Sequence, residues 1–270
     1  PPKKIGEDKW EDKEGRVFQA VRNANEIGCI YDPTIGKREY SVKDFEEPAT
    51  YLTDELAEEA CNFIERNQNQ PFFLYLAFNA VHTPMEATKA DLEKISGLTG
   101  KRRALAAMTF ALDRACGQVL RKLKELGLDD STLVVFANDN GGPTDASGAC
   151  NYPLSGCKAN FLEGGIRIPC IMKMPGKLKA NTVYNPVIST LDFLPTFVNL
   201  AGGKAETIGV LDGVDLIPFI SGKNNEKPNE KLFWKNEMEG AVRDGDWKLL
   251  RFPDRPAELY NVAEDISEKV

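Results

Sequence analysis

The feature that most constrains the fold is a set of short apolar runs separated by longer amphipathic segments. Residues 72–78 read Phe-Phe-Leu-Tyr-Leu-Ala-Phe, an apolar run of strand length without a polar interruption. An unbroken run of this kind is typical of a strand that is covered on both faces, as in the centre of a mainly parallel sheet. Two further buried strands are predicted at residues 133–137 and 166–174.

Helical periodicity fills the segments between these runs. A helix is predicted after Thr53, which can cap it, and another near residues 191–200. Residues 101–126 carry apolar side chains at spacings of three and four, which indicates a long amphipathic helix that ends before Gly127. Strands that alternate with helices predict an α/β fold, with a mainly parallel sheet flanked by helices.

The pattern changes at both ends of the chain. Residues 1–50 are polar and rich in turn signals, which predicts an irregular lead-in. Residues 223–228 resemble a linker, and the turn signal Asp244-Gly245 beyond it predicts a β-hairpin. We therefore expect residues 1–222 to belong to the α/β domain and residues 223–270 to form a small antiparallel subdomain.

Composition excludes several classes of protein. The chain has 34 Lys and Arg against 41 Asp and Glu, a net charge of −7 without a basic stripe, which argues against nucleic acid as a partner. No apolar run approaches the length that a membrane-spanning helix needs. The six cysteines form no Cys-x-x-Cys pair, which argues against zinc, and Cys150 and Cys157 are the best placed to form a disulfide.

Polar residues follow two of the predicted strands. His82, the only histidine, comes soon after the first strand, and Asp139 and Asn140 follow the second. Ligands of open α/β sheets bind beyond the carboxyl ends of the strands, so these residues are expected to open into one crevice. A carboxylate and an amide oxygen suit Ca²⁺ or Mg²⁺, but two ligands do not complete such a site.

Each of these residues also has a simpler interpretation. A single histidine is more often structural than functional, and Asp-Asn-Gly-Gly is an ordinary turn sequence. Lys158 could be a surface residue, and Arg167 could form an ion pair with Glu163.

A series of short motifs runs in order along residues 51–265. The motifs lie at residues 71–76, 82–84, 111–113, 139–142, 158, 163–169, 192–196, 212–216 and 259–262. Their joint order resembles the sulfatase family, within the alkaline phosphatase-like superfamily. Any one of these motifs alone would be weak evidence for the family.

The resemblance implies a sulfuric-ester hydrolase that acts on an aryl or glycan sulfate ester. Asp139 and Asn140 match the two late ligands of the family's divalent metal, usually Ca²⁺. His82 matches the histidine that contacts the sulfate ester and helps to protonate the leaving alcohol, and Lys158 matches the lysine that holds sulfate oxygens. Hydrolysis of a sulfate ester needs positive charge at the sulfate oxygens and a proton donor at the leaving oxygen, and a metal, a lysine and a histidine are suited to these tasks. Family habit implies export to the periplasm, the lysosome or the exterior.

The sequence also departs from the family pattern. The family's nucleophile is a formylglycine made in a Cys/Ser-x-Pro-x-Arg motif, and this chain contains no such motif. The early pair of metal-binding aspartates and a Lys-x-His segment are also absent. The simplest interpretation is a sulfatase that lacks its N-terminal part, is shortened at its C-terminal end, and is inactive alone.

Two alternatives stay open. One is a phosphomonoester, phosphodiester or phosphonate hydrolase of the same superfamily, although a single histidine argues against the two-metal site that many of these use. The other is a non-catalytic remnant, against which the joint presence of His82, Asp139, Asn140 and Lys158 argues.

Overall fold

A computed structural model of the chain describes residues 3–6, 9–11, 17–19 and 51–269. The chain divides into two compact units, Pro1–Leu52 and Thr53–Val270. In the first unit, strands β1 (Lys3–Gly6), β2 (Lys9–Glu11) and β3 (Val17–Gln19) form an antiparallel sheet in the order β1-β2-β3. The irregular lead-in predicted for residues 1–50 is therefore wrong at these strands, because segments of three or four residues are too short to show the alternation of a strand in the sequence.

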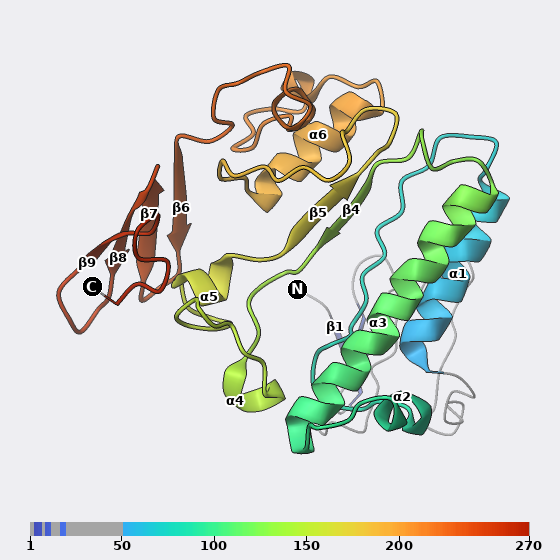
Figure 1. The fold of residues 1–270 in the computed structure, drawn as a ribbon, viewed down its shortest axis with the longest axis horizontal. Coiled ribbons are helices and arrows are strands. Elements are labelled where there is room, and N and C mark those ends of the chain that lie inside the picture. The colour runs from blue at the N-terminus through green and yellow to red at the C-terminus, as the bar shows by residue number, and fades with distance from the viewer. Residues whose placement is uncertain (1–2, 7–8, 12–16, 20–50, 270) are drawn as a thin grey trace. The chain divides into compact units, whose positions relative to one another are not determined.

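The predicted helices of the second unit are present. Helix α1 spans Leu52–Arg66, α2 spans Lys89–Glu93 and α3 spans Gly100–Glu125. Figure 1 shows α1 and α3 packed along each other. Ion pairs join the two helices, with Arg114 Nη2 2.9 Å from Asp54 Oδ2 and Lys122 Nζ 3.2 Å from Glu65 Oε2. Each helix also has a buried face rich in alanine: Ala57 and Ala60 in α1, and Ala107, Ala111 and Ala115 in α3. As the spacing predicted, α3 ends just before Gly127, which takes a φ of +69°.

The run at residues 72–78 does not form a strand with a partner among the described residues. It is extended, and its side chains alternate between half-buried and exposed. Phe72 packs edge-on against Phe63 of α1, with ring centroids 5.9 Å apart, and Phe73 lies 5.8 Å from Phe197. Nevertheless 69% of Phe73 and 82% of Tyr75 are exposed. The prediction of a strand buried on both faces is therefore wrong, because no described residues cover the second face completely.

Two short strands carry the chain through the centre of this unit. Strand β4 (Val134–Ala137) pairs with β5 (Cys170–Lys173) in antiparallel register, with Ala137 opposite Cys170. The described residues therefore contain no mainly parallel sheet, although segment 72–78 and β4 run in the same direction in Figure 1. Two short helices, α4 (Thr144–Ser147) and α5 (Glu163–Ile166), lie between the strands along the chain.

The predicted strand at residues 166–174 is shorter than expected. Its first residue belongs to α5, and the strand begins only at Cys170. The reason is local, because Gly164 and Gly165 pack against neighbouring backbone in a helical turn that the apolar pattern does not reveal.

The following segment is organised around a buried carboxylate. The turn η2 (Thr190–Asp192), capped by Ser189, leads into α6 (Phe193–Leu200). The fully buried Asp192 side chain accepts hydrogen bonds from Ser189 N (2.7 Å), Val214 N (2.9 Å) and Asn229 Nδ2 (2.9 Å). Two short elements, η3 (Ala205–Thr207) and α7 (Ile217–Ile220), follow.

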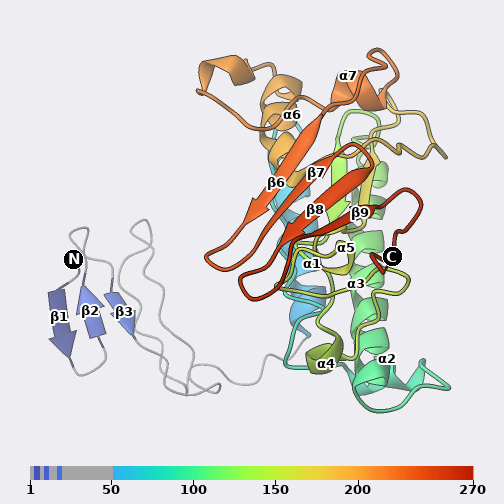
Figure 2. The same cartoon turned by 90° about the vertical axis from the view of Figure 1, so that its left-hand side faces the viewer.

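The C-terminal residues form the antiparallel sheet that the sequence predicts. Strands β6 (Lys231–Lys235), β7 (Gly240–Asp244), β8 (Trp247–Arg251) and β9 (Glu258–Asn261) pair in sequence order, as Figure 2 shows. The hairpin turn at Asp244-Gly245 is confirmed, with Asp244 paired to Trp247 and a φ of +58° at Gly245. The domain boundary at residue 222 stays a prediction.

The cysteines of the described region are all free. They are Cys61, Cys116, Cys150, Cys157 and Cys170. Cys150 and Cys157, the pair best placed in the sequence, therefore do not form a disulfide. Across the described residues, no helix combines the length and the apolar character needed to cross a lipid bilayer.

Candidate functional site

The structure brings two of the predicted site residues into direct contact. Lys158 Nζ lies 3.1 Å from His82 Nε2, although the two residues are 76 positions apart in the sequence. His82 is exposed and Lys158 is half-buried, so an ion in solution can approach the pair. An ammonium and an imidazole side by side are suited to bind an oxyanion.

The hydrogen bonds of His82 assign its tautomer. His82 Nδ1 lies 2.8 Å from the carbonyl oxygen of Thr83, which can only accept, so Nδ1 carries the hydrogen and donates it. In the neutral ring, Nε2 is then the acceptor of a hydrogen bond that the Lys158 ammonium donates. The imidazole therefore presents Nε2, the atom that exchanges a proton, to the same space as Lys158.

The loop that carries Asp139 and Asn140 is held against α5. Gly141 N donates to Gly165 O at 2.9 Å. A Cβ at Gly141 would collide with the Gly164 carbonyl oxygen, so this contact requires glycine. Position 165 also requires glycine, because a Cβ there would collide with the carbonyl oxygens of Cys157 and Asn160.

These backbone contacts connect the predicted residues into one region. Asn140 precedes the glycine that touches α5, and Lys158 follows the Cys157 carbonyl that touches Gly165. Lys158 in turn reaches His82. The loop of Lys158 thus contacts both the loop of Asn140 and His82. The single crevice expected for His82, Asp139 and Asn140 stays a prediction.

Asp139 and Asn140 are suited in chemistry to hold part of a hard cation. The exposed Asp139 carboxylate accepts a hydrogen bond from Asn140 N through Oδ1 at 2.9 Å, which leaves Oδ2 without a bond from this loop. Asn140 Nδ2 donates to Gly141 O at 2.9 Å, so Asn140 Oδ1 is the atom left as a ligand. Both free atoms are oxygens, as Ca²⁺ and Mg²⁺ prefer.

The same residues do not make a complete cage. Within the described ranges, no group of three or more His, Cys, Asp or Glu side chains could hold a metal ion. The donor set fits a divalent cation in kind but supplies two of the six to eight oxygens that Ca²⁺ takes.

Charged side chains surround Glu163, and two of the residues in this cluster, Lys248 and Glu268, belong to none of the sequence motifs. The predicted ion pair with Arg167 is confirmed, with Arg167 Nη1 at 3.4 Å from Glu163 Oε2. The structure adds Lys248, whose Nζ lies 2.9 Å from Glu163 Oε1 and 2.8 Å from Glu268 Oε1. Burial is the main influence on Glu268 and raises the pKa of its carboxyl, and the hydrogen bond from Lys248 partly opposes it.

A signal for Lys248 does exist in the sequence. It lies on β8 opposite Tyr260, with the buried positions of that strand alternating at Lys248 and Leu250. A lysine in phase with a buried leucine indicates an inward-facing charge that needs a partner.

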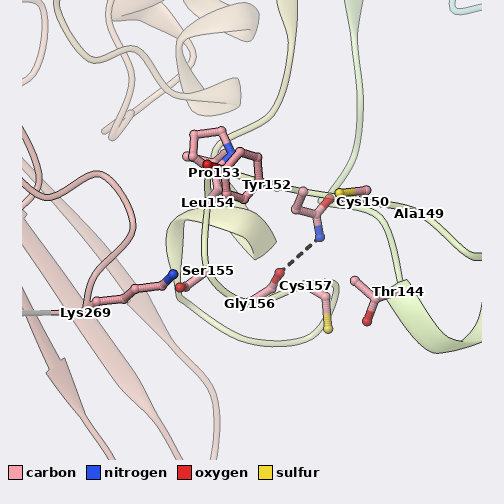
Figure 3. Close-up of a pocket in the computed structure, with 11 residues that line it drawn as sticks. Thr144, Ala149, Cys150, Tyr152, Pro153, Leu154, Ser155, Gly156, Cys157 and Lys269 are labelled. Atoms are coloured by element: carbon pink, nitrogen blue, oxygen red, sulfur yellow. Dashed lines mark hydrogen bonds between the residues drawn. The ribbon is translucent and has the colours of Figure 1, made fainter.

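A separate pocket lies beside this region. Residues 149–157 line it together with Thr144 and Lys269, and it encloses about 370 Å³ (Figure 3). Two of the lining residues are joined by a hydrogen bond that Asn151 Nδ2 donates to Gly156 O at 3.0 Å. None of the four predicted site residues lines this pocket. We place the candidate site at Lys158 and His82, because there the reactive side chains converge.

Comparison with known proteins gives consistent matches. Residues 12–203 match the family model described as Sulfatase, and residues 158–269 match the one described as N-sulphoglucosamine sulphohydrolase, C-terminal. Steryl-sulfatase of Mus musculus is 37% identical over 223 residues, which cover 77% of this chain and 35% of that protein. N-acetylgalactosamine-6-sulfatase of Canis lupus familiaris is 32% identical over 203 residues, covering 73% of this chain and 38% of the relative.

A solved structure shows the same fold. The crystal structure of Ps i-CgsB in complex with k-i-k-neocarrahexaose superposes with a TM-score of 0.77 at 36% identity. The match covers 83% of this chain and 51% of the other. This chain thus spans about a third of the two curated relatives and about half of the solved structure.

Proposed function

Because the chain belongs to the sulfatase family, we propose that it forms part of a sulfuric-ester hydrolase acting on an aryl or glycan sulfate ester. The observation that carries this proposal is the 3.1 Å contact between Lys158 Nζ and His82 Nε2. It places an ammonium group and an imidazole nitrogen side by side where an ion in solution can reach both. The names of the relatives, steryl-sulfatase and N-acetylgalactosamine-6-sulfatase, support a sulfate ester as the substrate.

The two side chains divide the work on a sulfate ester. Lys158 donates hydrogen bonds to sulfate oxygens and offsets the charge that gathers on them as the ester bond breaks. When the Lys158 ammonium turns from Nε2 to the sulfate oxygens, His82 Nε2 takes a proton from solvent and donates it to the oxygen of the leaving alcohol. The Thr83 carbonyl accepts from Nδ1 in both protonation states and so keeps the ring oriented.

For the metal, we propose that Asp139 and Asn140 contribute oxygen ligands to Ca²⁺, with Mg²⁺ as the alternative. When bound, the cation would withdraw charge from the sulfate group. The role of this chain is to hold the two ligands in place through the backbone bond from Gly141 to Gly165.

Turnover requires a nucleophile that these 270 residues do not contain. No Cys/Ser-x-Pro-x-Arg motif is present in the sequence. We therefore expect no hydrolysis of an aryl sulfate by this polypeptide alone, even with added Ca²⁺. Multiple turnover of p-nitrophenyl sulfate in a steady-state assay would contradict this expectation.

The binding role of Lys158 can be tested without turnover. Calorimetric titration with inorganic sulfate should show binding that Lys158→Met weakens by about 10-fold or more, since a charge-assisted hydrogen bond is lost. The exposed Lys124→Met on α3 is the matched control and should bind like the wild type. Equal affinity in both variants would refute the site. Tighter binding of phosphate than of sulfate would favour a phosphoester hydrolase.

The metal ligands need a separate measurement. Ca²⁺ should raise the melting temperature of the wild type, and Asp139→Ala should remove that increase. Asp145→Ala, which also removes an exposed carboxylate close by in the sequence, should retain it. A Ca²⁺ response that survives Asp139→Ala would show that the ion binds elsewhere.

A further inference from the structure

The loop that carries Lys158 is held at both of its ends by the C-terminal tail. At the first end, Ser155 Oγ donates to the carbonyl oxygen of Ser267 at 2.5 Å. At the other end, Glu163 N donates to Glu268 Oε2 at 2.6 Å. Two consecutive tail residues thus bind the two ends of the segment 155–163, more than a hundred residues earlier in the chain.

Buried charges reinforce the second of these contacts. Lys248 Nζ lies between two carboxylates, 2.9 Å from Glu163 Oε1 and 2.8 Å from Glu268 Oε1. All three side chains are at most 1% exposed. Arg243 Nη1 approaches the other oxygen of Glu163 at 3.5 Å. Because buried charges are strongly destabilised when a partner is lost, these contacts hold their geometry more strictly than apolar packing would.

The two ends of the loop are also joined to each other. Gly164 N donates to Ser155 O at 2.6 Å, which closes the segment into a ring next to Glu163. The Cys157 carbonyl rests on Gly165, directly before Lys158. A displacement of Glu163 is therefore passed to the backbone of Lys158 through a few short, rigid contacts.

We infer that Glu163, Lys248 and Glu268 are positioning residues that hold Lys158 against His82. The C-terminal sheet and tail thereby take part in forming the oxyanion site, although none of these three side chains touches it. This inference rests on the proposed function for its meaning, but the geometric claim can be tested without substrate.

The single histidine makes the test direct. In a ¹⁵N-labelled chain, the two ring nitrogens of His82 give the only imidazole signals of the protein, since the sequence has one His. Lys158→Met removes the ammonium next to Nε2 and gives the reference signals of an imidazole ring without a lysine contact. The test compares Glu268→Gln and Lys248→Met with this reference at one fixed pH, and near-UV circular dichroism verifies that each variant is folded.

We expect Glu268→Gln and Lys248→Met to shift the Nε2 signal most of the way toward that of Lys158→Met. Lys269→Met, an exposed change beside Glu268, should leave the signal at its wild-type position. If Lys248→Met unfolds the chain, Ser155→Ala serves instead, because it removes one hydrogen bond outside the ion cluster and should shift the signal part of the way.

Two results would overturn the inference. One is a wild-type His82 spectrum in folded Glu268→Gln and Ser155→Ala. The other is a spectrum that Lys158→Met itself does not change, since there would then be no contact to position. A chain that fails to bind sulfate but shows the expected shifts would refute the proposed function and leave the positioning role intact.

Discussion

Replacing Arg114 by methionine should destabilise the helical part of the chain by about 2–3 kcal/mol. Arg114 on α3 joins three helices, because its guanidinium binds Asp91 of α2 and Asp54 of α1. Its Nη1 lies 2.6 Å from Asp91 Oδ1, and its Nη2 lies 2.9 Å from Asp54 Oδ2. The Asp91 side chain is 3% exposed, so its charge depends on these partners.

The magnitude follows from the burial of the two partners. Removal of one member of a buried ion pair destabilises a protein by about 3–5 kcal/mol. Arg114 is 34% exposed, so solvent screens part of its charge, and Asp91 keeps the hydrogen bond from Thr88 Oγ1 at 2.8 Å. Both effects reduce the expected loss of folding free energy in Arg114→Met to about 2–3 kcal/mol.

The pH dependence has a definite sign. The hydrogen bond from Arg114 is the main influence on Asp91 and lowers the pKa of its carboxyl, against the opposing effect of burial. A carboxyl with a lowered pKa in the folded state contributes stability above the pKa of the unfolded chain, about 4, and this contribution is lost as the pH falls below it. The free energy of unfolding of the wild type should therefore fall between about pH 5 and pH 3, more steeply than that of Arg114→Met.

Urea denaturation followed by far-UV circular dichroism measures both effects. At neutral pH the midpoint of Arg114→Met should be lower by about 1 M, since urea slopes are typically about 1–3 kcal/mol per molar. Arg121→Met, an exposed change on the same helix, is the matched control. A midpoint for Arg114→Met equal to that of this control would refute the reasoning.

Three further outcomes are expected. Asp192→Ala should lower the free energy of unfolding by about 3 kcal/mol, because it removes the buried acceptor of three half-buried N–H donors, and Asp192→Asn should lower it less. Equal effects in a urea titration would contradict this. The double change Phe73→Ser and Tyr75→Ser should reduce the fluorescence of bound ANS, and an unchanged signal would show that the dye binds elsewhere. Iodoacetamide should label the exposed Cys150 before Cys61, because burial raises the pKa of the Cys61 thiol, and peptide mass spectrometry gives the order.

Local patterns predicted the elements whose stability is decided within a short stretch of chain. The periodicity of α3 and the turn at Asp244-Gly245 are confirmed because i, i+4 side chains and the turn residues meet through local geometry. The strand expected at residues 72–78 is wrong for the opposite reason. An apolar run shows that a segment can be buried, and a partner elsewhere in the chain decides whether it is.

The sequence by itself determined the family, the main helices and the C-terminal antiparallel sheet. It also identified the candidate site residues His82, Lys158, Asp139 and Asn140. Only the tertiary structure decided that Lys158 touches His82, and that Lys248 and Glu268 hold Glu163. The physical reason is that charges pair over a few ångströms in space, whatever their separation along the chain, so neither periodicity nor motif spacing reveals their partners.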